Sequence, residues 1–164
     1  MSGERTITRR EFVSTSAAVG ALAAGPMSLL EAPAVHIPSR ATPLVISDSS
    51  GYRFRNGGPE NSVERAFRGI TGGEDVLDAL MAGVNIPELD PEETGIGYGG
   101  LPNAEGVVQL DACCMHGPKR QAGGVASLEG VRTPSLVAKA VMENTDHHLL
   151  VGEGAQRFAR QLGF

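Results

Sequence analysis

The chain has 164 residues, of which 41% are hydrophobic and 20% charged, an ordinary composition for one globular domain. Tryptophan is absent and aromatic residues make up 4%, so an aliphatic core is expected, while 22 glycines indicate tight turns rather than a simple helical bundle. The formal net charge of −5 and the lack of a basic patch argue against nucleic acid as a partner.

Residues 1–34 have the pattern of an export signal. Arg9 and Arg10 precede Phe12 and a mildly apolar run over 13–24. The adjacent arginines favour the twin-arginine route, and the run is too short and too rich in Ala and Gly for a membrane span. We therefore expect an exported protein, periplasmic or extracellular; the alternative is a disordered basic N-terminus.

Two positions fit signal cleavage, and both place the same domain after it. One A-x-A sequence ends at Ala34, and a similar sequence ends at Ala41. Residues 35–42 are predicted to form a linker, and residues 43–164 the domain.

The first half of the domain is predicted to contain one strand and two helices. Residues 43–48, PLVISD, are apolar enough for a short buried strand. Asn61 is a possible N-cap for a helix over 61–70. A second helix is predicted over 74–86, where apolar residues recur on one face, and Pro87 is expected to stop it before an acidic turn.

The second half mixes hairpin and crossover connections. Thr133 is a natural N-cap, with Pro134 at the first helical position. The predicted elements are a strand over 106–117, its hairpin partner over 122–130, a helix over 133–145, a short strand over 147–152 and a last helix over 153–164. This order predicts an α/β (α+β) layered fold.

Gly95, Gly97 and Gly100 match the dinucleotide-binding spacing G-x-G-x-x-G. That fingerprint requires a strand directly before the glycines and a helix directly after them. Here a predicted helix and an acidic turn precede, and Pro102 and a predicted strand follow. Dinucleotide binding is therefore the least favoured interpretation.

Cys113 and Cys114 are adjacent in a predicted strand, where neighbours point to opposite faces. A disulfide between them would need strained geometry, so two buried free thiols are expected.

The sequence predicts no metal site and no cofactor. Asp111 and His116 are five residues apart in a predicted strand and point to opposite faces, and the neighbouring Asp146, His147 and His148 lack the fixed spacing of metal ligands. Asp111 is instead expected to be a buried hydrogen-bonding residue at a strand bend.

A longer segment carries a family resemblance. Residues 90–117, DPEETGIGYGGLPNAEGVVQLDACCMHG, are similar to the conserved block of glycosylasparaginases, which belong with plant-type asparaginases and isoaspartyl peptidases. The family motif G-Y-G-G-x-P-x-x-x-G-x-V-x-L-D-A is matched from Gly97 to Ala112. The pieces TPSLVAKAVME and LLVGEGAQRFA follow in the family order, so the resemblance covers residues 43–164.

Within this motif, a structural role is expected for each of Gly97, Tyr98, Gly99, Gly100 and Asp111. The glycines are expected to shape a tight turn into the strand, and Tyr98 to be a packing anchor rather than a catalyst. No ligand is assigned to any of them.

The resemblance implies an N-terminal nucleophile hydrolase with a four-layer αββα sandwich. In such enzymes a precursor cuts itself, and the hydroxyl of the new N-terminal Thr attacks a β-linked asparagine amide with its own α-amine as base. This sequence stops at Phe164, before the segment that would carry the Thr. We expect an α-chain half without catalytic residues, which pairs with a β half as a hetero-oligomer; it would be a separate subunit, a truncated gene product or a fragment.

The resemblance also suggests one substrate contact and leaves the substrate open. Ser49 or Ser50 stands where the family places a substrate-facing residue after its first strand. The expected substrate is a small aspartyl amide: glycosylasparagine, free asparagine or an isoaspartyl peptide. The alternative is a non-catalytic fragment or binding module, and dinucleotide binding is a distant third.

Overall fold

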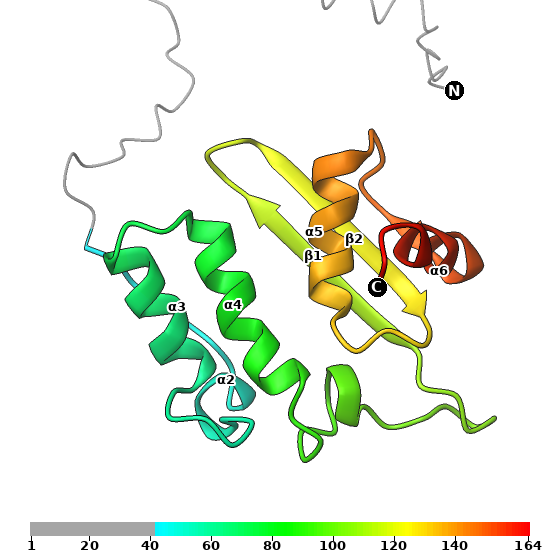
Figure 1. Cartoon of the computed structure of the whole chain (residues 1–164), viewed down its shortest axis with the longest axis horizontal. Coiled ribbons are helices and arrows are strands. Elements are labelled where there is room, and N and C mark those ends of the chain that lie inside the picture. Colours follow the sequence, from blue (N-terminus) through cyan, green and yellow to red (C-terminus); the bar gives the residue numbers. More distant parts are fainter. Residues whose placement is uncertain (1–41) are drawn as a thin grey trace, which may run out of the picture. The chain divides into compact units, whose positions relative to one another are not determined.

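A computed structural model describes residues 42–164 of the chain, and Figure 1 shows their arrangement. The predicted export signal over 1–34, and the predicted linker apart from Thr42, lie outside the described residues. The described part is a mixed α/β structure with a three-stranded sheet. None of its helices is both long and apolar enough to cross a membrane.

Two of the predicted helices are confirmed as α3 (Ser62–Thr71) and α4 (Val76–Glu88). Asn61 caps α3 as expected, because its side chain accepts from the backbone N–H of Glu64 while the Glu64 carboxylate accepts from the Asn61 N–H. The prediction that Pro87 stops α4 is wrong. Pro87 lies within the last turn of the helix, which ends one residue later.

The strand predicted over residues 43–48 is wrong. These residues have no regular secondary structure and pair with no described strand, and Leu44 and Ile46 are 76% and 83% exposed. A short helix, α2 (Ser50–Arg53), follows them. An apolar segment becomes a strand only beside another strand edge that accepts its hydrogen bonds, and no such edge lies next to it in the described part.

The sheet has the order β1-β2-β3. The predicted hairpin is confirmed, with β1 (Leu110–His116) antiparallel to β2 (Gln121–Leu128), whereas β3 (Leu150–Val151) runs parallel to β2. β1 begins four residues later than predicted because residues 103–107 form a turn, in which the Asn103 side chain accepts from the N–H groups of Glu105 and Val107.

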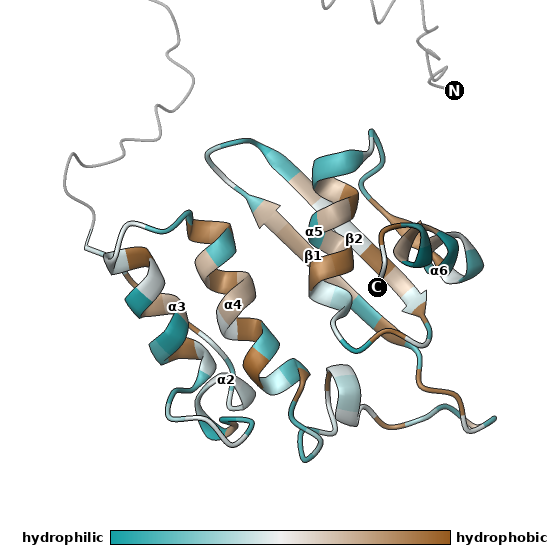
Figure 2. Ribbon diagram, in the orientation of Figure 1, coloured by the Kyte–Doolittle hydropathy of each residue, from teal (hydrophilic) through white to brown (hydrophobic). Residues whose placement is uncertain are grey.

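One face of the sheet is covered by α5 (Pro134–Asn144), while α6 (Gly152–Gln161) packs beside it against β2. The approach is close at Gly123, where a Cβ would run into the backbone carbonyl of Ala138. Figure 2 shows apolar residues on α4, on α5 and along β1, whereas α6 is mainly hydrophilic. The core centres on the fully buried side chains Val125, Leu128, Val137 and Val141.

The opposite face of β1 has no helix over it. Leu110, Cys114 and His116 alternate toward the covered face and are buried, whereas Cys113 and Met115 are exposed. The expectation of two buried thiols is therefore wrong for Cys113, because adjacent strand residues point to opposite faces and only one face is covered.

Candidate functional site

The glycine-rich segment forms a tight 3-10 turn, η1 (Gly97–Gly99), packed on the end of α4. Gly97 has φ +59°, and a Cβ on it would meet the Glu88 backbone carbonyl and lie 2.7 Å from the Glu88 Cα. A Cβ on Gly99 would lie 2.8 Å from the carbonyl oxygen of Pro91. Glycine is required at both positions because the backbone approaches its neighbours too closely for a side chain.

The secondary structure around these glycines differs from that of a dinucleotide fingerprint. The segment follows α4 and an acidic turn, and the next regular element after η1 is the strand β1. The turn thus packs against α4 instead of opening a helix whose N-terminus could face a pyrophosphate.

Beside this turn, Glu88 is a buried carboxylate that organises the start of α5. It is only 3% exposed, and its Oε1 accepts from the backbone N–H of Ser135 at 2.9 Å. Its Oε2 accepts from the Ser135 hydroxyl and from the side-chain amide of Asn85, both at 2.6 Å. Burial raises the pKa of the Glu88 carboxyl, although the hydrogen bonds from Ser135 and Asn85 act in the opposite direction.

This contact replaces the expected N-cap of α5. Thr133 occupies the N-cap position and Pro134 the first turn, as predicted, but the Thr133 side chain makes no capping hydrogen bond. Glu88 supplies that acceptor from a residue 47 positions earlier in the chain. No local pattern in the sequence connects the end of one helix to the start of another so far away, so this cap could not be predicted.

A cavity of about 400 Å³ lies between the glycine turn, β1 and the start of α5. Its lining includes Glu88, Gly97, Asp111, Cys113 and Ser135. The cavity therefore combines one buried carboxylate with an exposed thiol and the backbone of the glycine turn.

The polar pair Ser135 and Glu88 has the distance of a nucleophile and its base, but its environment makes it a helix cap. Ser135 is only 4% exposed, and the Glu88 carboxylate also accepts the Ser135 backbone N–H. Although Ser135 belongs to the cavity lining, its hydroxyl and its backbone N–H both donate to the Glu88 carboxylate, so the pair holds the start of α5.

A second pair, His116 and Asp75, joins the end of β1 to the start of α4. His116 Nε2 lies 2.9 Å from Asp75 Oδ2, and its Nδ1 accepts from the Lys119 N–H at 3.1 Å. These partners fix the Nε2–H tautomer and leave no lone pair for catalysis. Asp75 also caps α4 by accepting from the Leu77 N–H, and the hydrogen bond with His116 lowers the pKa of Asp75 to about 2.

Asp111 lies at an irregularity in β1, but the expectation that it is buried is wrong. The register between β1 and β2 shifts at this residue, and Asp111 Oδ1 accepts from the Ser127 N–H at 2.7 Å. The side chain is exposed because it belongs to the face of the sheet that no helix covers. Its hydrogen bond holds Ser127, whose φ is +51°, in the bulge.

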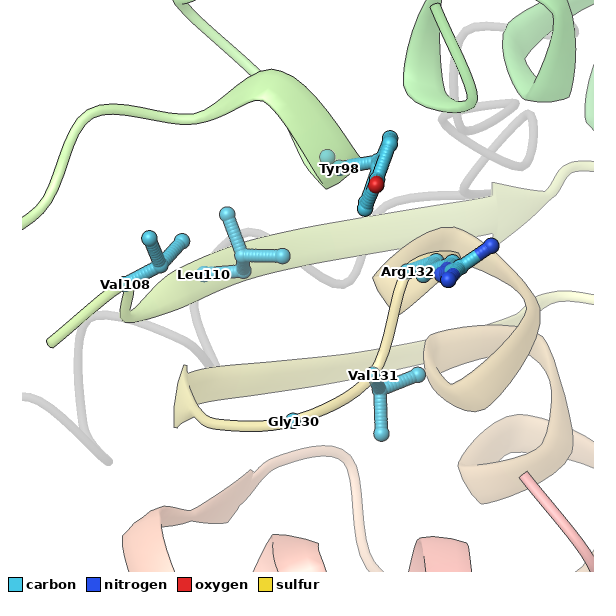
Figure 3. A pocket seen from close by; sticks show the side chains of 7 residues that line it. Tyr98, Val108, Leu110, Gly130, Val131 and Arg132 are labelled. Carbon is cyan, nitrogen blue, oxygen red and sulfur yellow. The ribbon is translucent and has the colours of Figure 1, made fainter. Parts of the chain in front are cut away.

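The remaining predicted residues lie apart from this cavity. Ser49 and Ser50 are at the start of α2 and do not line it, and within residues 42–164 their hydroxyls form no hydrogen bond. Tyr98 points out of the glycine turn toward Arg132 and is 48% exposed (Figure 3). No group of three His, Cys, Asp or Glu side chains in the described part is placed to hold a metal ion.

The chain is similar in sequence to known proteins along most of its length. A family model described as "Asparaginase" matches residues 49–164. An N(4)-(β-N-acetylglucosaminyl)-L-asparaginase of Elizabethkingia miricola is 38% identical over 95% of this chain and 44% of its own length. A plant-type L-asparaginase of Pyrococcus horikoshii is 46% identical over 54% of this chain and 28% of its own length.

A mammalian relative is also similar to most of this chain but extends well beyond the match. The N(4)-(β-N-acetylglucosaminyl)-L-asparaginase of Mus musculus is 35% identical over 64% of this chain and 30% of its own length. The chain thus spans less than half the length of these curated relatives.

The glycine turn yields a first prediction. Gly97→Ala and Gly106→Ala both place a side chain at positive φ, with a cost of about 1–2 kcal/mol each. Only Gly97→Ala also collides with Glu88, since a Cβ on Gly106 meets nothing within 4 Å. We expect Gly97→Ala to lower the free energy of unfolding by about 1–3 kcal/mol more than Gly106→Ala in urea titrations. Equal losses would show that the close packing carries no energetic weight.

The pKa of Asp75 yields a second prediction. It is lowered from 3.8 to about 2 in the folded chain, so its stabilising contribution is complete above pH 4 and is lost as the pH falls toward 2. Asp75→Asn keeps a helix cap but does not titrate. In thermal melts between pH 2 and 6, the advantage of the wild-type chain over this variant should shrink below pH 4. Asp146→Asn, on an exposed loop, serves as control; an Asp75→Asn difference independent of pH would contradict the prediction.

Proposed function

The chain belongs to the asparaginase family, and from this membership we propose that it is the α-chain portion of an exported amidohydrolase. The substrate bond is the side-chain amide of asparagine or of N4-glycosylated asparagine, and the activity resides in a complex with a Thr-bearing β half. The observation that carries the proposal is the family match itself, which extends from the start of α2 to the end of α6.

The proposed complex is a four-layer αββα sandwich, in which the described residues supply one helical layer and part of one sheet. The support comes from the uncovered face of that sheet. Met115 is 74% exposed there, and Leu149, whose side chain lies over Gly124, is 56% exposed. In an αββα sandwich the two sheets pack face to face, so a second sheet from the β half would cover these side chains.

The chemistry proposed for the complex depends on groups outside the described residues. A terminal Thr hydroxyl would attack the amide carbon, and the free α-amine of the same residue would accept its proton. Within residues 42–164, the two candidate pairs are committed to structure, Ser135–Glu88 as a helix cap and His116–Asp75 as a clamp. The proposed role of this chain is therefore to form one wall of the substrate cleft.

The second candidate is a non-catalytic fragment or binding module. It is favoured by the structural roles of the Ser135–Glu88 and His116–Asp75 pairs, which leave neither pair for catalysis. The two functions differ in what a partner does. For the enzyme, addition of the β half creates activity; for the binding module, no partner creates it.

A reconstitution experiment tests the proposed function. The full chain is purified alone and after co-expression with the part of the Elizabethkingia miricola relative that lies outside the match. Release of aspartate is followed from asparagine, a β-aspartyl dipeptide and N4-acetylglucosaminyl-asparagine. We expect no turnover by the chain alone and turnover of at least one substrate by the co-purified complex. Hydrolysis by the chain alone, or a stable complex without activity, would contradict the proposal.

The active complex also tests the proposed substrate contacts. Ser49→Ala or Ser50→Ala should raise KM about 2- to 10-fold with kcat little changed, the effect of losing one hydrogen bond to bound substrate. Ser47→Ala is the control, because the Ser47 hydroxyl donates to Asp48 within the chain. Unchanged KM in both variants would remove Ser49 and Ser50 from the site.

Export by the twin-arginine route is a separate part of the proposal. It rests on Arg9 and Arg10 ahead of an apolar run, and the match with the Elizabethkingia miricola relative extends into this region because it covers 95% of the chain. Residues 1–41 fused to a folded fluorescent reporter should direct it to the periplasm, and Arg9→Lys with Arg10→Lys should retain it in the cytoplasm. Cytoplasmic retention of the unmodified fusion would contradict the export proposal.

A further inference from the structure

A second, smaller cavity lies where the glycine turn meets the loop between β2 and α5. Its volume is about 220 Å³, and we call it the Arg132 pocket. Figure 3 shows Tyr98 reaching from the turn toward Arg132, with Val108 and Leu110 at the start of β1 and Val131 on the facing loop. It shares only Gly97 and Leu110 with the larger cavity.

Arg132 is held in this pocket without an anionic partner among the described residues. Its guanidinium carbon lies 4.4 Å from the centre of the Tyr98 ring, whereas no carboxylate of residues 42–164 forms an ion pair with it. Stacking occupies the flat face of a guanidinium and leaves its in-plane N–H donors available. The pocket therefore presents an oriented set of donors in a chain of net charge −5.

Aliphatic side chains form the rest of the lining. Leu110 and Val131 are each 9% exposed, and Val108 is half-buried. A phosphate would require several cations or converging N–H groups, whereas this lining offers one guanidinium beside aliphatic side chains. The volume is below the range of about 300–1,000 Å³ usual for drug-sized ligands, which suits a molecule of about amino-acid size.

The two segments that carry Tyr98 and Arg132 are both anchored to Glu88, although the Tyr98 and Arg132 side chains themselves are exposed. The backbone of the glycine turn that carries Tyr98 packs closely on Glu88, and the loop that carries Arg132 ends at the start of α5, where Glu88 accepts from the Ser135 N–H. The stacking on Tyr98 restricts the Arg132 guanidinium, and each restriction made before binding lowers the entropy that a ligand must cost. We propose that the Arg132 pocket binds a small aliphatic carboxylate, with the carboxylate on the Arg132 guanidinium and the tail against Val108, Leu110 and Val131.

Binding of 4-methylpentanoate to the full chain tests this site directly. Ligand-observed NMR should give a Kd of about 0.1–10 mM, and methyl signals of Val108, Leu110 and Val131 should shift on titration. Arg132→Gln should weaken binding at least about 10-fold. Arg53→Gln is the matched control, because Arg53 also stacks on an aromatic ring, Phe54, but lines none of the cavities described.

A neutral probe keeps the test independent of any variant. The isosteric 4-methylpentanamide should bind the wild-type chain at least about 10-fold more weakly than the acid. Equal binding of acid and amide, or unaltered binding to Arg132→Gln, would overturn the proposal. If neither probe binds but Arg132→Gln abolishes association with the β half, the pocket receives a protein carboxylate and the free-acid site is wrong. The readout is not catalytic, so failure here leaves the amidohydrolase proposal intact.

Discussion

The close contact between the glycine turn and the end of α4 is the constraint on which the rest of the described structure depends. Gly97 packs its backbone on Glu88, and the carboxylate of Glu88 reaches across to begin α5 at Ser135. A helix, a turn and a second helix are thereby joined at one residue. Because α5 covers the sheet through Gly123, the position of Glu88 also determines how the sheet is packed.

The same contact explains why the polar residues that look catalytic are structural. A buried carboxylate with a raised pKa is a common mark of an active site, yet the Glu88 carboxylate uses both oxygens to hold Ser135 and Asn85. The groups with free bonding capacity lie at the rims instead, with Cys113 beside the larger cavity and Arg132 in the smaller one. Both cavities include Gly97 of the turn in their lining, so this one local constraint contributes to each of them.

Local signals in the sequence were sufficient for the hairpin and for the helices α3, α4, α5 and α6, but not for the short helix α2 or for contacts between distant segments. The Asn61 cap and the tight turn at the glycines depend on residues a few positions apart, and both could be predicted. The Glu88 cap depends on residues 47 positions apart, so no periodicity or spacing indicates it. The exposure of Asp111 and Cys113 depends on which sheet face a helix covers, which alternation alone does not specify.

The failed strand prediction over residues 43–48 has the same physical origin as the uncovered face of the sheet. Leu44 and Ile46 have the side chains of a buried strand, and Met115 has that of a sandwich interior, yet all three are exposed in the described part. In the proposed complex each would gain a non-local partner: a strand edge for the first two and a second sheet for the third. The proposed β half would supply both at once. Protection of the backbone amides of 43–48 and burial of Met115 should therefore appear together on assembly, since a single added sheet accounts for both.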